Sequence, residues 1–162
     1  MAKIVLSLGS NIEPRISHLR QVVETISDWA IKGTIASSQL YETEPNGFNS
    51  QNEFINMVIS FNANLSPLDL LQKINNLELG HGRIRNKGIT EDRTIDIDIL
   101  FYDDLILENE NLTIPHPRLH LRNFVLTPLL DIEPDLIHPI LKKSVWELYD
   151  ECKDTKEVRI LE

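Results

Sequence analysis

Two aspartates, Asp96 and Asp98, lie two residues apart in an otherwise apolar, β-branched run over residues 93–100. Such a run predicts a half-buried strand with alternating side chains, so both carboxylates share one face and the isoleucines around them share the other. The two Cα atoms would lie about 7 Å apart, which lets both carboxylates reach one hard cation or a close pair. Carboxylate oxygens favour Mg²⁺, Mn²⁺ or Ca²⁺. The alternative is an exposed sheet face where the carboxylates pair with arginine or lysine.

A basic stretch precedes this strand and contains Arg83, Arg85, Lys87 and Arg93. Arginine side chains bind phosphate oxygens in pairs through their planar fork of donors. A basic loop that leads into an acidic strand suits a nucleoside triphosphate, because metal ions bridge its phosphates and arginines neutralise the remaining charge. The alternative is a solvated run of charge that pairs with acidic surface.

A histidine, His116, follows the acidic strand and stands between Pro115 and Pro117, with Arg118 and Arg122 close behind. The prolines restrict the backbone here, so His116 is held either for a phosphate contact or for a neutral hydrogen bond. No glycine-rich loop ending in Lys-Ser or Lys-Thr precedes a helix, and no nucleophile motif is present. Phosphoryl chemistry would therefore depend on metals and arginines rather than on a covalent intermediate.

The composition excludes several classes of function. The chain has 162 residues with 41% hydrophobic and 25% charged residues, so we expect one globular domain over residues 1–162. A net charge of −9 argues against nucleic-acid binding. The single cysteine, Cys152, excludes an internal disulfide and a cysteine metal site. The N-terminus lacks the pattern of a signal peptide and no run is long enough to cross a membrane, so we expect a cytoplasmic protein. We also expect a monomer.

The elements that must position these residues follow from periodicity and from proline and glycine. We expect strands over residues 3–8, 34–43, 54–63 and 93–100, helices over 14–29, 66–80, 124–130 and 145–149, and a loop over 44–52. Residues 105–107 are expected to pair back on the acidic strand as a hairpin. The strand at 54–63 alternates cleanly, which predicts one core face and one partly wet face, and Gly80 is the expected helix stop. This order predicts an α/β or α+β domain with a largely antiparallel sheet.

These motifs together resemble the 6-hydroxymethyl-7,8-dihydropterin pyrophosphokinases of the folate pathway. The RTxDxDIL pattern and the PHPR pattern, in this order and spacing, are specific to that family. The matching blocks are residues 8–11 (LGSN), 41–47 (YETEPNG), 54–56 (FIN), 77–78 (LE), 82–85 (GRIR), 93–100 (RTIDIDIL), 113–118 (TIPHPR) and 122–126 (RNFVL).

The resemblance implies a fold and a reaction. The family fold is a single three-layer α/β/α domain with a largely antiparallel central sheet of ferredoxin-like type. The reaction is a Mg²⁺-dependent diphosphotransfer, in which ATP gives its β,γ-diphosphoryl group to the hydroxymethyl oxygen of the pterin and leaves as AMP. Two Mg²⁺ ions are implied, held at the positions of Asp96 and Asp98.

The resemblance also implies roles for individual residues, which we carry over by position. The implied catalytic residues are Arg83, Arg93, Asp96 and Asp98. The implied ATP contacts are Glu78, Arg83, Arg85, Ile99, Thr113, His116 and Arg122. The implied pterin contacts are Thr43, Pro45, Phe54, Asn56, Asp96 and Phe124. A ring stacked on Phe124 and hydrogen-bonded by Asn56 suits a flat heterocycle that is rich in donors and acceptors.

One segment departs from the family pattern. Members often carry Arg-Trp-Gly-Pro just before the Arg-Thr block, whereas residues 89–92 here are Ile-Thr-Glu-Asp. Two acids near a triphosphate are unfavourable unless they point away or approach a metal. Two alternatives to the pyrophosphokinase therefore stay open: a metal-dependent phosphohydrolase that uses the same aspartates, and a nucleotide- and pterin-binding module with weakened turnover.

Overall fold

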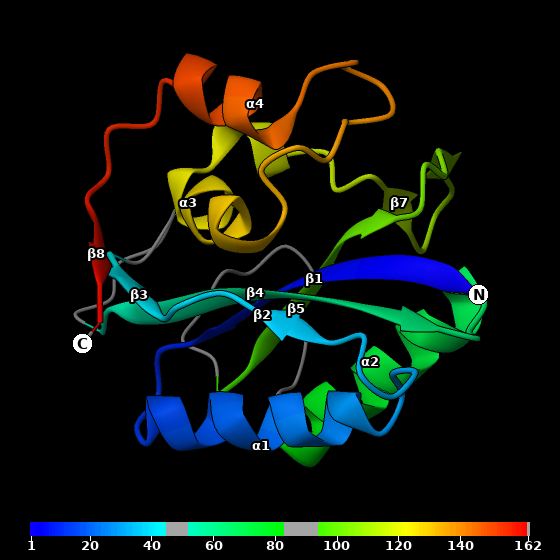
Figure 1. Ribbon diagram of the computed structural model, residues 1–162. Helices are drawn as coiled ribbons and strands as arrows, with labels where there is room; N and C mark the ends of the chain where they lie inside the picture. The colour runs from blue at the N-terminus through cyan, green and yellow to red at the C-terminus, as the bar shows by residue number, and fades with distance from the viewer. Residues whose placement is uncertain (45–51, 83–93, 162) are drawn as a thin grey trace.

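The computed structural model describes residues 1–44, 52–82 and 94–161. Within them a central antiparallel sheet has the order β5-β1-β4-β3-β8, with the short strand β2 paired to β4. Two helices, α1 and α2, cover one face of the sheet, and α3 and α4 lie on the other (Figure 1). The predicted class, a three-layer α/β/α domain with an antiparallel sheet, is confirmed.

The centre of the sheet is built from three strands in adjacent positions. β1 (Ala2–Ser10) pairs antiparallel with β4 (Phe54–Ala63) along its whole length and with β5 (Asp96–Tyr102) on its other side. The chain order with one helix between β1 and β4 and another between β4 and β5 is the βαββαβ arrangement of ferredoxin-like folds. As a result, the strand with the aspartates lies at an edge of the main sheet.

The first face of the sheet packs on α1 (Arg15–Ser27) and α2 (Pro67–Gly80). Apolar side chains of β1, β4 and β5 alternate toward these helices and form the larger core, which includes Leu6, Ile59 and Ile97. The α2 helix begins as its sequence predicts, because the Ser66 hydroxyl accepts a hydrogen bond from the backbone of Asp69. The helix also ends at Gly80, as predicted, and the residue with a left-handed backbone is Gly82, two positions later, with φ of +85°.

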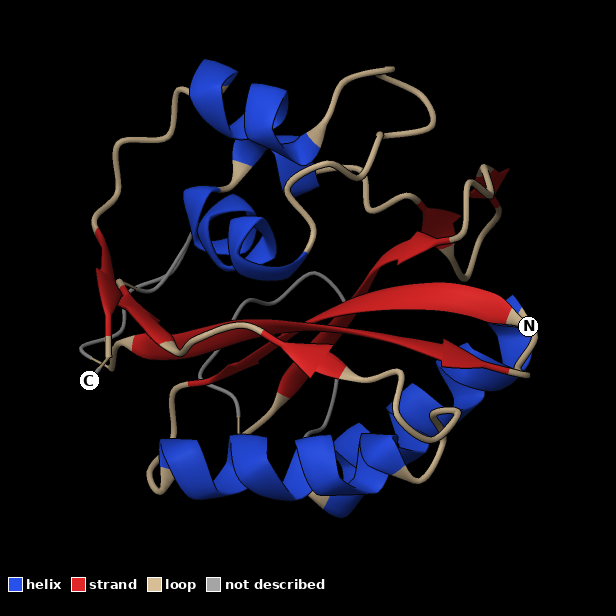
Figure 2. Cartoon of the chain, viewed as in Figure 1, coloured by secondary structure: helices blue, strands red, loops and turns tan. Residues whose placement is uncertain are grey.

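The second face of the sheet packs on α3 (Asn123–Ile132) and α4 (Val145–Glu151), with a 3₁₀ turn at Leu119–Leu121 (Figure 2). Val5, Val58 and Leu100 form a second core with these helices. The prediction of a partly wet face on the strand at 54–63 is therefore wrong for most of its length. Single-strand alternation does not reveal a third layer that comes from residues far along the chain.

The strand predicted over residues 34–43 is two short strands, β2 (Ala36–Ser37) and β3 (Tyr41–Thr43). Between them the Ser38 hydroxyl accepts a hydrogen bond from the backbone N–H of Val58, at 2.9 Å, and donates one to the carbonyl of Gln39. A side chain thus replaces a backbone partner in the ladder and interrupts the strand. The edge of β3 is covered by β8 (Val158–Ile160), which periodicity did not predict.

The predicted hairpin between residues 105–107 and the acidic strand is wrong. The short strand β6 (Leu107–Glu108) pairs instead with β7 (Thr113–Ile114). The outer edge of β5 is contacted by another segment, because the backbone N–H of His116 donates a 3.0 Å hydrogen bond to the carbonyl of Leu100. This contact brings the His-Pro segment beside the aspartates. None of the helices in the described ranges is long and apolar enough to span a membrane.

Candidate active site

The candidate active site begins where β1 changes from apolar to small residues on the face toward α3. Val5 belongs to the α3 core, and Ser7 and Gly9 follow on the same face. The register places Ser7 opposite Asp98 and Gly9 opposite Asp96. Both carboxylates therefore share one face, as the alternation predicted, and they lie beside small side chains that leave room for ligand atoms above the sheet.

Two polar side chains, Asn56 and Thr43, lie on the side of Gly9 that is opposite to Asp96. Asn56 lies opposite Gly9 on β4, and its amide donates a 2.7 Å hydrogen bond to the hydroxyl of Thr43 on β3. Both side chains are buried. The structure thus places Asn56 in one row with Gly9 and Asp96, and its hydrogen bond brings Thr43 beside that row, although these residues are far apart in the sequence.

Gly9 is required by the close approach of its neighbours. A Cβ atom at this position would lie 2.9 Å from Oδ1 of Asn56 and 3.5 Å from Cδ1 of Phe54. Any larger residue would push Asn56 away, because a 2.9 Å contact is well inside van der Waals distance. The sequence predicted a strand over residues 3–8 only, whereas β1 continues to Ser10 and Gly9 is part of the site wall.

The opposite wall comes from the start of α3. Arg122 is the N-cap residue of this helix, and its guanidinium carbon lies 5.6 Å from the centroid of the Phe124 ring. A guanidinium over an aromatic face is a favourable cation–π arrangement. Phe124 and Arg122 therefore form one half-buried surface of apolar and cationic character.

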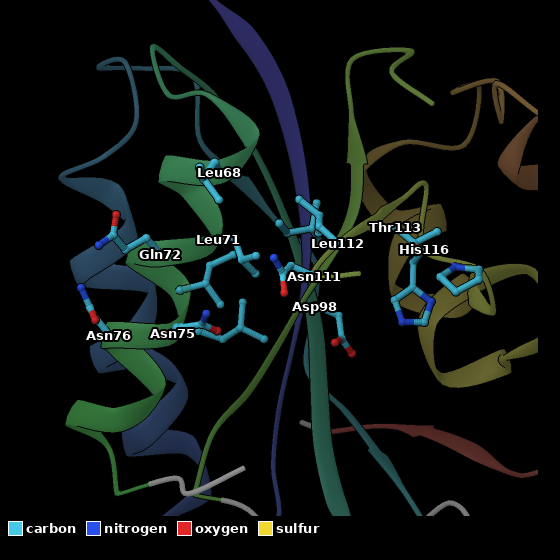
Figure 3. A pocket seen from close by; sticks show the side chains of 14 residues that line it. Leu68, Leu71, Gln72, Asn75, Asn76, Asp98, Asn111, Leu112, Thr113 and His116 are labelled. Carbon is cyan, nitrogen blue, oxygen red and sulfur yellow. The ribbon is translucent and has the colours of Figure 1, made fainter. Parts of the chain in front are cut away.

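A cavity of about 830 Å³ lies beside β5, between α2 and residues 111–117. This volume falls within the range of small-molecule sites, about 300–1,000 Å³. Figure 3 shows Leu71 and Asn75 of α2 on one side of the cavity and Thr113 and His116 on the other, with Asp98 between them. Ile99 also lines it. Four residues with implied metal or ATP contacts thus surround a single cavity.

Several further lining residues were not predicted from the sequence. Leu71 and Leu112 provide apolar surface, and Asn75 and Asn111 provide amide groups. Leu71 belongs to the apolar stripe of α2, so its periodicity indicated only a core position. Asn111 and Leu112 lie in the turn before β7. The sequence did not indicate this turn, because residues 105–107 were expected to pair with the acidic strand and not with β7.

His116 is held by two hydrogen bonds of the backbone. Its own N–H donates to Leu100, and its ring Nδ1 accepts a 3.1 Å hydrogen bond from the N–H of Arg118. Because Nδ1 accepts a hydrogen bond, the neutral ring carries its own proton on Nε2. Of the two roles that the sequence left open, this geometry satisfies the neutral hydrogen bond and leaves Nε2 as the donor for a ligand.

The charge state of His116 follows from its surroundings. Burial, and after it the positive charges of Arg122 and Arg118, lower the pKa of His116 to about 4, although the negative charge of Asp96 opposes this shift. His116 is therefore a neutral donor at neutral pH rather than a cation.

Glu78, for which the family resemblance implied an ATP contact, is buried, with 2% of its surface exposed. Its Oε2 accepts a 2.9 Å hydrogen bond from the backbone N–H of Ile97. In the described structure Glu78 does not line the cavity. It joins α2 to the strand between the two aspartates, and so it fixes the position of the acidic strand.

Some of the predicted site residues lie outside the described residues. They are Pro45, Arg83, Arg85 and Arg93, together with Lys87 and the altered segment 89–92. Their roles stay predictions.

The carboxylate oxygens of Asp96 and Asp98 are suitable ligands for a magnesium ion that also binds a substrate. Within the part of the chain that is described, no three His, Cys, Asp or Glu side chains come together as a metal cluster. Mg²⁺ typically takes one or two carboxylates and completes its octahedron with water and substrate phosphates. A two-carboxylate face beside a nucleotide-sized cavity meets that requirement.

Comparison with known proteins agrees with this geometry. The family model described as "7,8-dihydro-6-hydroxymethylpterin-pyrophosphokinase (HPPK)" matches residues 5–134. The chain belongs to the HPPK family. It is 39% identical over 151 residues to the 2-amino-4-hydroxy-6-hydroxymethyldihydropteridine pyrophosphokinase of Aquifex aeolicus, covering 93% of this chain and 92% of that protein. It is 34% identical over 160 residues to the enzyme of the same name from Haemophilus influenzae, covering 99% of both chains.

Solved structures of HPPK proteins share the fold. The HPPK-DHPS protein of Plasmodium falciparum, a structure with pteroate, aligns with a TM-score of 0.72 at 18% identity. The alignment covers 93% of this chain and 42% of that one, so the chain spans less than half of this structural neighbour. At this identity the likeness establishes the fold alone.

Proposed function

We propose that this chain transfers the diphosphoryl group of ATP to the hydroxymethyl group of 6-hydroxymethyl-7,8-dihydropterin and so acts in folate biosynthesis. Membership of the HPPK family supports this reaction. The observation that carries the site is the position of Asp96 and Asp98 between a cavity and a pair of buried polar side chains. The cavity beside α2 lies next to Asp98, and the Asn56–Thr43 pair lies one strand beyond Asp96.

The cavity beside β5 suits the nucleotide. Leu71, Ile99 and Leu112 offer apolar surface to a base, and Thr113 offers a hydroxyl to the nucleoside. The phosphates would then point toward Asp98 and His116, where the neutral Nε2–H donates to a phosphate oxygen. Arg122 adds positive charge from α3, and Arg83, Arg85 and Arg93 are proposed as further phosphate contacts.

The face around Asn56 suits the pterin. Asn56 and Thr43 provide amide and hydroxyl groups for the edge of the heterocycle, and Phe54 and Phe124 provide aromatic surface for its flat faces. Pro45 is proposed as a further contact. The hydroxymethyl group would then extend toward Asp96 on β5, which is separated from Asn56 on β4 by strand β1.

The reaction requires no protein nucleophile. The pterin hydroxymethyl oxygen attacks the β-phosphorus of ATP, the bond from that phosphorus to the α,β-bridging oxygen breaks, and AMP leaves while the hydroxyl proton passes to solvent or a carboxylate. Asp96 and Asp98 would hold two Mg²⁺ ions, which neutralise charge on the phosphates when bound. The chain itself orients both substrates in line and donates from His116 to the charge that develops.

The products distinguish this function from its alternatives. Protein mixed with ATP, Mg²⁺ and the hydroxymethyl dihydropterin should yield AMP and pterin diphosphate in equal amounts. Release of phosphate without the pterin would indicate a phosphohydrolase. Binding of both ligands by calorimetry without any AMP would indicate a binding module, the alternative that the altered segment 89–92 leaves open. Either of these two results refutes the proposal.

The dependence on Mg²⁺ is a separate part of the proposal. Chelation with EDTA should abolish AMP formation, and added Mg²⁺ should restore it. Full activity in EDTA would contradict the role given to the two aspartates. We also expect a cytoplasmic monomer with two small-molecule substrates, and sedimentation at concentrations near those of the assay tests the oligomeric state.

A further inference from the structure

The C-terminal segment, residues 154–161, contacts both walls of the proposed pterin region. Figure 1 shows it descending from α4 past α3 to the edge of the sheet, where β8 lies beside β3. It belongs to neither the cavity beside α2 nor the aspartate face. The residues that it contacts, however, are direct neighbours of Thr43, Phe54 and Phe124.

Its first anchor is at the start of α3. The backbone N–H of Asn123 donates a 3.0 Å hydrogen bond to Oδ2 of Asp154, and the Asn123 amide donates to the backbone carbonyls of Asp154 and Lys156, the latter at 3.1 Å. The N-cap residue Arg122 makes no side-chain cap of its own. Asp154 therefore caps α3 from a distant part of the chain, and its negative charge suits the N-terminal end of the helix.

Its second anchor is the edge strand that carries Thr43. In β8, Val158 lies opposite Thr43 and Ile160 opposite Tyr41, and the N–H of Leu161 donates a 2.8 Å hydrogen bond to the carbonyl of Leu40. Without this pairing, β3 would be an exposed edge of only three residues, which is too short to be held firmly by β4 alone.

Its third anchor is a network of ion pairs around Arg159. The guanidinium of Arg159 contacts Glu42 at 3.3 Å and Glu53 at 2.5 Å, and Arg15 contacts Glu42 from the other side at 2.8 Å. Glu42 immediately precedes Thr43, and Glu53 immediately precedes Phe54. Because several charges share the network, it fixes geometry better than an isolated surface pair does.

We propose that the C-terminal segment sets the distance between the two walls of the pterin region, and that Asp154 and Arg159 are positioning residues for that substrate. This inference rests on the proposed function. One end of the segment holds α3, which carries Phe124, and the other end holds β3, which carries Thr43. A single stretch of chain thus determines how the aromatic wall faces the hydrogen-bonding wall.

The proposal predicts an effect that is specific for one substrate. In Asp154→Ala, the KM for the pterin should rise about tenfold, which corresponds to about 1.4 kcal/mol. The KM for ATP should change less than about threefold, because the segment is anchored at α3 and β3, whereas the cavity proposed for ATP is lined by α2, β5 and residues 111–117. Asp154→Asn, which keeps one acceptor oxygen, should recover part of the loss. Asp150→Ala is the matched control, since it removes an exposed carboxylate of α4.

Calorimetry separates positioning from general loss of stability. Titration of each variant with the pterin gives both a Kd and a binding stoichiometry. A variant that is merely less stable loses stoichiometry but keeps its Kd, whereas loss of positioning raises the Kd at full stoichiometry. Arg159→Ala provides a second test that leaves the fold intact, because this side chain is 37% exposed.

Each negative result has a distinct meaning. If the wild-type protein forms no AMP, the proposed function fails. If the wild type forms AMP but Asp154→Ala and Arg159→Ala bind and use the pterin as the wild type does, the positioning role is refuted while the proposed function stands. An equal rise in the KM of both substrates also refutes it.

Discussion

At the scale of single residues, the proposed chemistry depends on which oxygen and nitrogen atoms face the space above β5. Asp96 and Asp98 share that face because side chains alternate, and His116 is turned toward it by the hydrogen bond to the N–H of Arg118. The sequence was sufficient to predict the aspartate pair, because a period of two is the simplest pattern in a strand. It could not decide the state of His116, which depends on a backbone contact that no spacing reveals.

Asp98→Asn should abolish most of the activity. The substitution keeps the shape of the side chain but removes one anion from the proposed metal site, so kcat should fall by at least about 100-fold. The thermal midpoint should stay within a few degrees of the wild type, since Asp98 is partly exposed. The matched control is Asp104→Asn in the exposed turn after β5, which should keep wild-type activity. Activity of Asp98→Asn within about tenfold of the wild type would contradict the two-carboxylate site.

His116 should make the metal-free protein less stable in mild acid. Its pKa is lowered from 6.5 to about 4 in the folded state by burial and by Arg122, so the unfolded chain binds more protons between these values. Stability is therefore complete above pH 6.5 and falls as the pH drops toward 4, with about 2 kcal/mol lost between pH 7.5 and pH 5. Urea unfolding of the wild type and of His116→Asn at both pH values isolates this effect. An identical pH dependence in the two proteins would show that His116 does not carry it.

At the scale of elements, the site depends on how strands and helices are held against one another. Three strands bring Asn56, Gly9 and Asp96 into one row, and α2 is fixed to β5 by Glu78. The strands at 54–63 and 96–102 and the helix that starts after Ser66 were predictable, because their patterns are long and regular. The short strands β6, β7 and β8 were not, since two or three residues carry no measurable period.

Gly9→Ala should weaken pterin binding. The added Cβ would lie 2.9 Å from Oδ1 of Asn56, so that side chain must move and its bond to Thr43 is strained or lost. Overpacking of this kind typically costs about 1–3 kcal/mol. Fluorescence titration should show a pterin Kd raised at least tenfold (about 1.4 kcal/mol). Gly80→Ala in α2, where nothing lies within 4 Å of the new Cβ, should leave binding unchanged. Equal affinities for the wild type and Gly9→Ala would exclude Asn56 from the pterin region.

Glu78→Ala should destabilise the protein. The change leaves the buried N–H of Ile97 without the acceptor that Oε2 provides at 2.9 Å, which costs about 1–3 kcal/mol. Glu78→Gln keeps an acceptor oxygen and should lose less. Chemical denaturation of the three proteins at pH 7 gives the free energies of unfolding. If Glu78→Ala is as stable as the wild type, the contact between α2 and β5 is not a determinant of the fold.

At the scale of the whole molecule, three layers place two substrate regions on either side of one acidic strand. The class of fold followed from the order of elements, and the family followed from the motif blocks, so both were accessible from the sequence. Periodicity alone did not show that α3 and α4 close the second face, because neither helix is adjacent in sequence to the strands that it covers, and only the family resemblance implied a third layer. The part played by residues 154–161 was hidden for the same reason, since its anchors at Asn123 and Glu42 are distant in the chain.

A crystal structure with Mg²⁺, a non-hydrolysable ATP analogue and the hydroxymethyl dihydropterin tests the central claim most directly. The proposed function predicts the base beside Leu71 and Ile99, two Mg²⁺ ions between the phosphates and the carboxylates of Asp96 and Asp98, and the pterin between Asn56 and Phe124. The pterin hydroxymethyl oxygen should lie in line with the β-phosphorus, about 3–3.5 Å away. A nucleotide bound elsewhere, or metal ions without contact to these two aspartates, would contradict it.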